Sequence, residues 1–465
     1  MRTQPQGDRG ETYHMQQVPG GLTTATRPPT TIPLRHVLVA LVFLLAGAVL
    51  GVARIRYGPT AGSAFGGIAV AHLLLVGWVT LTIIGAMTQF VPVWSGVELR
   101  SKRLATAQLL LVSVGVAGFA GALWVGRPVA GIAFAACLVA GFGVFVYNLS
   151  RTLWRARPLD VTEGHFALAL GFFAITAILG GLLAADYRYG VLATLGLARS
   201  SVIDAHVTVA VFGGVLATVI GALYQLGPMF TQSDATALDD RLVRAETVAY
   251  PVGVALLATG RLVEHAVVAA GGGLLVATGV LLAGVVLARR LGNATTSGTP
   301  MLSRYAVVAL AAIAWSLTAA GTWASRPLGV TVRFGHPDVG AILLGAVVGF
   351  VVVGSLYHVV PFIVWLERYS DRVGLERVPA IDDLYDRRLA TIDLGVTVAG
   401  SVLLVVSAVA PLGHVVGVVR LFAGVLLLVG ASLFAANLVY TVGRHGGTAV
   451  IGSSAGSPGV DTSDP

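Results

Sequence analysis

Three histidines occupy similar places along this chain, each in or beside a long apolar stretch. They are His72, His206 and His336, and each lies upstream of the same phrase, in which a glycine is followed by a polar residue and a proline. An imidazole in the hydrocarbon of a membrane is costly unless it binds a ligand or pairs with a neighbouring helix. The three histidines are therefore expected to be either ligands or interhelical hydrogen-bond partners.

The repeated phrase reads GAMTQFVP, GALYQLGP and GSLYHVVP and begins at Gly85, Gly221 and Gly354. These glycines are 136 and 133 residues apart, a spacing that predicts a threefold internal repeat. The glycine, the residue four positions later and the proline seven positions later share one helix face. We expect these faces to point at a common centre, with glycine allowing close approach and proline closing each helix.

The composition is that of a membrane protein. Of the 465 residues 56% are hydrophobic and 11% charged, and the mean hydropathy is +0.84. We predict an all-α polytopic protein with twelve transmembrane helices, since apolar runs of the necessary length of about 20 residues recur along the chain. The predicted helices are 34–53, 65–92, 104–125, 128–150, 163–185, 202–228, 243–261, 265–288, 303–323, 338–366, 391–411 and 415–441.

The helices group into three repeats of four, at about 34–150, 163–288 and 303–441, and the polar tails 1–33 and 442–465 are expected to be disordered. The single cysteine, Cys137, excludes disulfides and cysteine-based metal sites.

The charges predict how the bundle is oriented. With both termini in the cytoplasm of a cell membrane, the inner segments carry 21 basic residues and the outer loops 8. This asymmetry follows the positive-inside rule. The motif helices are then the second, sixth and tenth, each running inward, so that the upstream histidines lie toward the outer surface.

The distances from histidine to motif glycine are unequal, at 13, 15 and 18 residues. On ideal helices with about 100° per residue, His72 falls opposite Gly85, whereas His206 and His336 fall near their own glycines. Either local bulges correct this difference or the histidines have different roles.

These segments resemble subunit I of the heme-copper oxidase superfamily, including its NnrS-like branch. The resemblance rests on AHLLLVGWVTLTIIGAMTQFVP from Ala71, AHVTVAVFGGVLATVIGALYQLGP from Ala205 and YHVVPFIVW from Tyr357. That family has twelve helices in three arcs of four, with metal ligands on the second, sixth and tenth. The architecture matches over most of the transmembrane region, and the motifs cover about 80 residues of it.

The resemblance implies roles for the histidines. His72 resembles the second-helix ligand of the low-spin heme, His206 the sixth-helix histidine that binds copper, and His336 is the available ligand at the outer end of the tenth helix. The seventh helix lacks the family's histidine pair, and Ala210 stands where a tyrosine is expected. The family's paired tenth-helix histidines would fall near Gly340 and Ala341. Heme is therefore the implied cofactor, and copper is not expected.

Arg420 is the charge placed well inside the twelfth helix. An arginine within the membrane indicates function, and the resemblance implies that it could pair with heme propionates. The alternatives are a side chain that reaches outward to the interface or one that pairs with Asp204. His336 precedes Pro337, a favoured first helical position, so it is also open to a role as a helix-start residue.

Several polar residues lie near the inner ends. His358 and His165 are expected to form hydrogen bonds with neighbouring helices, and a second site or a proton path is an alternative for His358. Tyr224 and Tyr357, beside the motif, are also expected to bond between helices.

Two functions follow. The first is a heme-binding membrane protein that acts in electron transfer or nitric-oxide-related metabolism with an electron-donor protein partner. The second is a metal-free transporter or structural membrane protein on the same scaffold. Transporters are more often built from two repeats with helices broken at midplane, which favours the first. A catalytic oxidase or nitric oxide reductase is disfavoured by the missing seventh-helix histidines.

Overall fold

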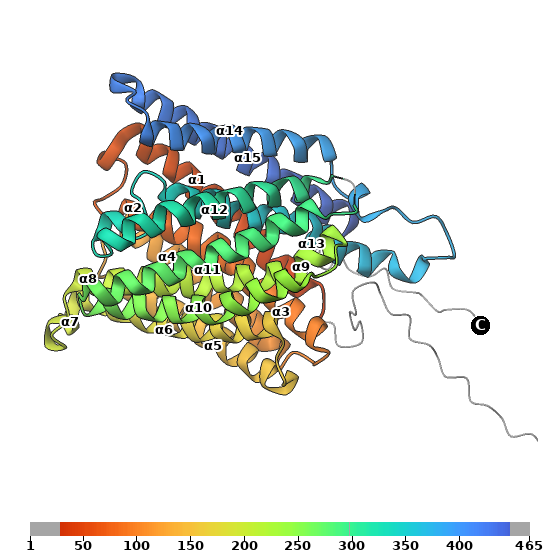
Figure 1. The fold of residues 1–465 in the computed structure, drawn as a ribbon, viewed down its shortest axis with the longest axis horizontal. Helices are drawn as coiled ribbons and strands as arrows, with labels where there is room; N and C mark the ends of the chain where they lie inside the picture. The colour runs from red at the N-terminus through yellow and green to blue at the C-terminus, as the bar shows by residue number, and fades with distance from the viewer. Residues whose placement is uncertain (1–27, 297, 447–465) are drawn as a thin grey trace, which may run out of the picture.

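A computed structural model describes residues 28–296 and 298–446 of the chain. Within these residues all named elements are helices, and the long ones lie roughly parallel in a single bundle (Figure 1). Twelve helices in the described part are long and apolar enough to cross a membrane. The predicted all-α polytopic fold is confirmed, and the chain is an integral membrane protein.

The spans lie close to their predicted positions. They are Thr31–Thr60, Gly66–Ser95, Lys102–Trp124, Ile132–Ala156, Val161–Tyr189, Arg199–Thr231, Ala237–Leu262, Ala266–Gly292, Pro300–Ser325, Ile342–Arg368, Arg387–Val409 and Gly413–His445. The α-helices within them are α1 (Thr31–Tyr57), α2 (Gly66–Ala71), α3 (Leu81–Ser95), α4 (Lys102–Trp124), α5 (Ile132–Leu153), α6 (Val161–Tyr189), α8 (Arg199–Thr208), α9 (Ala217–Thr231), α10 (Ala237–Leu262), α11 (Ala266–Gly292), α12 (Pro300–Ser325), α13 (Phe350–Arg368), α14 (Arg387–Val409) and α15 (Val416–His445), with the short α7 (Val191–Thr194) in a loop.

Several helices begin earlier than the apolar pattern predicts because polar residues cap them. Asp160 accepts a hydrogen bond from the backbone of Glu163, whose side chain bonds back to it, and this capping box starts α6. Thr236 and Asp239 form the same arrangement at the start of α10. The Thr299 hydroxyl caps α12. These polar first turns extend the helices by a few residues beyond the apolar runs.

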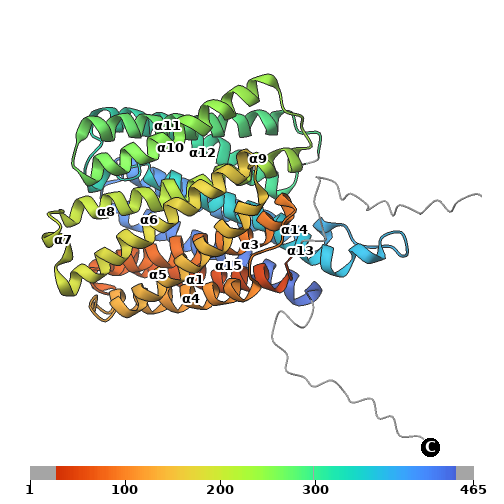
Figure 2. The same cartoon turned by 90° about the horizontal axis from the view of Figure 1, so that it is seen from below.

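The bundle closes on itself. Neighbouring spans pack in sequence, most extensively α10 on α11, α11 on α12 and α14 on α15, and α1 packs against α15. Successive spans run in opposite directions, so the starts of odd-numbered spans and the ends of even-numbered spans meet at one end. We call this the terminal end. Residues 369–386 project from it, and α7 lies at the opposite end (Figures 1 and 2).

The second, sixth and tenth spans share a local feature. Each contains a π-helical segment, at His72–Thr80, Val209–Leu216 and Ile342–Gly349. Each segment ends five residues before its motif glycine, at Gly85, Gly221 and Gly354. A π-helix bonds residue i to i+5 and alters the turn, so ideal α-helical angles between histidine and glycine do not apply here. Local bulges are therefore present in all three spans.

The motif prolines do not close their helices, contrary to the prediction. Pro92, Pro228 and Pro361 lie inside helices that continue to Ser95, Thr231 and Arg368. Proline removes one backbone hydrogen bond. In membrane spans the freed carbonyl is commonly satisfied by neighbouring groups or local adjustments, so the helix persists.

The predicted tails lie mostly outside the described residues. Their described edges differ from the prediction, because α1 already begins at Thr31 and α15 runs to His445.

Candidate functional site

His72 lies at the end of the bundle opposite the terminal end and is the first residue of its π-helical segment. Its Nδ1 atom lies 2.8 Å from the carbonyl oxygen of Ile68, one turn earlier. The ring packs edge-on against Phe119 of α4, with 5.0 Å between the ring centroids. Donation from Nδ1 to a carbonyl leaves the Nε2 lone pair as the available ligand atom.

His206 lies at the same end, in α8, and its ring is directed at α6. The carbonyl of Thr176 accepts a hydrogen bond from the imidazole. A Cβ atom on Gly180 would lie 3.0 Å from the Cε1 atom of His206, so this glycine leaves room for the ring. The Nδ1 atom is buried and has no hydrogen-bond partner. A buried nitrogen without a partner calls for an explanation, and a bound group is one.

The two imidazoles lie near each other. His72 and His206 are close enough for a charge on one to be felt by the other. Each ring offers a nitrogen lone pair, so in their donor chemistry the two residues fit a group that takes imidazole ligands.

The described residues do not add further metal ligands to the two histidines. Among the described residues, no three His, Cys, Asp or Glu side chains gather as metal ligands would.

His336 is not part of this pair. The tenth span begins at Ile342, so His336 lies in the preceding loop and not at the helix start expected from Pro337. Its side chain is 42% exposed, and its Nδ1 atom lies 3.7 Å from a carboxylate oxygen of Asp338. The positive φ of Gly335 belongs to the same loop, whose turns delay the start of the helix.

Arg420 also lies elsewhere. It is exposed on α15, and its guanidinium donates a long hydrogen bond of 3.4 Å to the carbonyl of Ser407 in α14. Asp204, the predicted acidic partner, pairs instead with Arg333. Arg420 therefore faces the surroundings of the bundle, as in the alternative of an outward-reaching side chain, and its place at a cofactor stays a prediction.

The terminal end holds a second group of polar residues, among them His165, Tyr224 and Tyr357, for which hydrogen bonds between helices were predicted. In the second repeat, His165 of α6 lies with Nε2 at 3.2 and 3.3 Å from the carboxylate oxygens of Glu246 in α10. Tyr224 of α9 donates a hydrogen bond of 2.9 Å to the same carboxylate. The expected interhelical bonds of His165 and Tyr224 are thus confirmed, and their shared partner is a fully buried glutamate.

The third repeat repeats this arrangement with other residues. Arg304 of α12 forms a buried ion pair with Asp393 of α14, and the Tyr357 hydroxyl of α13 donates to the same carboxylate. Asn437 of α15 donates to the tyrosine oxygen at 3.4 Å. The predicted interhelical bond of Tyr357 is confirmed.

The first repeat has the same positions without the charges. His36 of α1 and Gln108 of α4 are both fully buried. The Nε2 atom of His36 and both amide atoms of Gln108 have no hydrogen-bond partner. Thr88 occupies the position of the tyrosines and bonds within its own helix, to the carbonyl of Gly85.

The motif glycines explain why these clusters form. A Cβ atom on Gly85 would lie 2.5 Å from the Cβ of His36, and one on Gly221 would lie 2.6 Å from that of His165. On Gly354 it would lie 3.2 Å from the Cβ of Arg304. Because it has no side chain, the glycine of each motif thus makes room for the polar residue of the preceding odd-numbered span.

His358 makes ring contacts in place of the hydrogen bond that was predicted. Its imidazole lies 4.5 Å from the ring of Phe230 and 6.2 Å from that of Phe362, measured between centroids. It packs as an aromatic side chain between the sixth and tenth spans.

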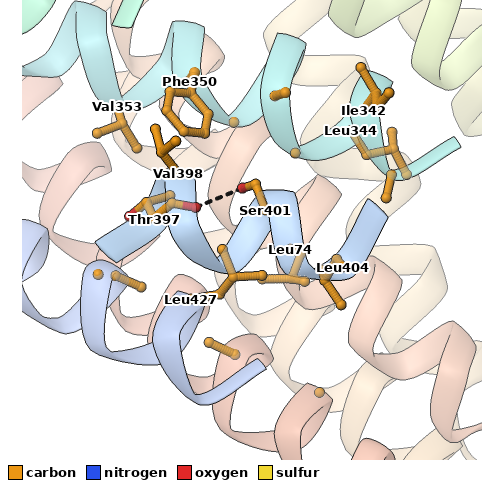
Figure 3. A pocket seen from close by; sticks show the side chains of 18 of the residues that line it. Leu74, Ile342, Leu344, Phe350, Val353, Thr397, Val398, Ser401, Leu404 and Leu427 are labelled. Atoms are coloured by element: carbon orange, nitrogen blue, oxygen red, sulfur yellow. Dashed lines mark hydrogen bonds between the residues drawn. The ribbon is translucent and has the colours of Figure 1, made fainter. Parts of the chain in front are cut away.

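An apolar cavity of about 730 Å³ lies between the first, second, ninth, tenth, eleventh and twelfth spans. Phe350 and Val353 of the tenth span face Val398 of α14 across it, and Ser401 bonds to the carbonyl of Thr397 on its wall (Figure 3). Arg304 and Asp393 line the part nearest the terminal end, whereas neither His72 nor His206 lines it.

The sequence reading missed Glu246, Asp393 and His36. The available signal was a carboxylate inside an apolar span, which indicates function by default. Glu246 and Asp393 lie close to the predicted starts of their helices, and no role was predicted for them.

No protein-family model matches this chain, and no curated protein is similar to it. The resemblance to the heme-copper oxidases therefore rests on the motif residues alone.

Proposed function

We propose that this integral membrane protein binds heme at the end opposite the terminal end, where His72 and His206 would hold the heme iron. In this proposal the protein acts in electron transfer or nitric-oxide-related metabolism and receives electrons from a protein partner. The observation that carries it is the proximity of the two imidazoles, one with Nε2 unengaged and the other with a buried, unpartnered nitrogen.

The surrounding residues would prepare the ligands. The Ile68 carbonyl fixes the tautomer of His72, and Phe119 limits the rotation of its ring. The Thr176 carbonyl and the space at Gly180 set the orientation of His206. A heme bound there would supply one-electron redox chemistry.

An absorption spectrum of the detergent-purified protein from heme-replete cells tests this proposal. We expect a Soret band that is lost in His72→Ala and altered in His206→Ala, because each variant removes one of the histidines that would hold the heme iron. His414→Ala, at an exposed position in the 3-10 turn that precedes α15, is the matched control and should keep the wild-type spectrum. A colourless wild-type protein, or a band unchanged in both ligand variants, would overturn the proposal.

The apolar cavity favours a second candidate, a metal-free transporter or structural membrane protein. A cavity of about 730 Å³ among six spans is of a size that holds a small apolar molecule. Mass spectrometry of molecules that co-purify with a colourless protein would distinguish this function from heme binding.

A further inference from the structure

We propose that His165, Tyr224 and Glu246 form a proton-binding site at the terminal end of the second repeat. The site takes up a proton from the adjacent aqueous phase and releases it to the same phase. This inference goes beyond heme binding and does not depend on it.

The hydrogen bonds place the proton. The Nδ1 atom of His165 lies 2.8 Å from the carbonyl oxygen of Val161, so Nδ1 carries a hydrogen. Nε2 then faces both carboxylate oxygens of Glu246, at 3.2 and 3.3 Å. A bare Nε2 and an ionised carboxylate offer only lone pairs to each other. A proton between them turns this contact into a charge-assisted hydrogen bond.

Because the pair is buried, gain or loss of that proton changes its electrostatic energy strongly. Glu246 is 0% exposed and His165 is 2% exposed, so neither water nor salt screens the pair. Without the proton the pair carries one negative charge. The Tyr224 hydroxyl stabilises this charge by donating a hydrogen bond of 2.9 Å to the Glu246 carboxylate. With the proton the imidazolium and the carboxylate neutralise each other.

The charged groups that pack near Glu246 are engaged elsewhere, so His165 is its cationic partner. Tyr250 lies on the same helix, where its hydroxyl donates to the Phe212 carbonyl at 2.6 Å and feels the glutamate charge. On α11, which packs along α10, Arg289 pairs with Asp239 and Arg290 bonds to the Ser233 carbonyl. Within the described chain, the ion pair of Glu246 is with His165.

The other two repeats show why the second is the one that exchanges a proton. In the third repeat the partner of Asp393 is the guanidinium of Arg304, which stays protonated in proteins. In the first repeat the buried polar residue of the third helix is Gln108, whose amide does not titrate. An imidazole facing a carboxylate is found at this position in the second repeat.

The site lies close to water. His165 is four residues beyond the start of α6 at Val161, which corresponds to about 6 Å along the helix axis. A proton from hydronium or a buffer acid adds to Nε2 and forms imidazolium. Its release restores the neutral ring, and no other bond forms or breaks.

Infrared difference spectroscopy on the purified full chain tests the proposal. Isotope-labelled histidine identifies the ring bands, and the pH is stepped between about 5 and about 8, where imidazoles usually titrate. The chain has ten histidines, so the bands of the site are those in which the wild type differs from His165→Gln. We expect coupled changes of imidazole and carboxylate bands in this difference. Glu246→Gln should lose both, because a buried imidazole without the carboxylate stays neutral, and His165→Gln should lose the imidazole change.

The tyrosines give a matched pair of variants. Tyr224→Phe removes the donor to Glu246 and should move the pH at which the bands change. Tyr357→Phe removes the equivalent donor in the third repeat and should leave those bands unaltered.

The proposal is overturned if the pH-dependent histidine bands of the wild type match those of folded His165→Gln or Glu246→Gln protein. Folding is checked by size exclusion and helical circular dichroism, and either variant suffices if the other fails to fold. A Soret band, if present, should survive both substitutions, which separates this test from that of heme binding.

Discussion

The Nε2 atom of His165 lies 3.2 Å from a carboxylate oxygen of Glu246, although 81 residues separate them in the chain. The contact joins the first and third helices of one repeat, and the tyrosine that completes it comes from the second. Arg304, Tyr357 and Asp393 join the corresponding helices of the next repeat. A polar cluster at the terminal end is thus a property of the four-helix unit.

Breaking the third-repeat ion pair should destabilise the protein strongly. Asp393→Ala leaves the guanidinium of Arg304 buried without its counter-charge, and we expect the free energy of unfolding to fall by about 3–5 kcal/mol. Denaturant titration in detergent, followed by circular dichroism, measures the change. The double variant Arg304→Met with Asp393→Leu should be more stable than the single variant. If the costs of the two substitutions simply add, the pair is not coupled.

Adding a side chain to a motif glycine that packs against a polar residue should destabilise the protein. Gly221→Ala would place its Cβ 2.6 Å from that of His165, and we expect a loss of about 1–3 kcal/mol in unfolding free energy from overpacking. Gly227→Ala is the control in the same helix, because no atom lies within 4 Å of its added Cβ. Equal melting temperatures for the two variants would contradict the packing described here.

Arg261 should hold the loop that precedes the tenth span. Its buried guanidinium donates to the carbonyls of Pro327, Val332 and Arg333 and to the Thr208 hydroxyl. Arg261→Met leaves these acceptors unpaired, so faster amide hydrogen exchange is expected across residues 326–341. Arg261→Lys should restore only part of the protection, because an ammonium lacks the planar fork of donors. Unchanged exchange in Arg261→Met would show that the loop is held by other contacts.

The sequence was sufficient for the twelve spans because bilayer thickness imposes long apolar runs, which can be read without knowing the partners. The motif also identified the second, sixth and tenth spans as a related set, and each proves to contain a π-helical segment before its glycine. Those segments themselves could not be predicted. Their turns, like the ones that delay the tenth span beyond His336, depend on packing between helices.

The sites were less predictable than the spans. His72 and His206 were identified because an imidazole within an apolar run is unusual, and the structure brings them near each other. Arg420 was singled out on the same grounds, but its helix turns it outward. The clusters around Glu246 and Asp393 depend on which distant helices become neighbours. A single span does not carry that information.

The π-helical segments separate each central span into two parts that can change independently. In a continuous α-helix, adding or removing one residue rotates everything beyond it by about 100°. A segment that already absorbs an irregular turn allows such a change to be accommodated locally. A residue inserted or removed in the histidine-bearing part of the second or sixth span would therefore leave the glycines and polar clusters at the terminal end in register.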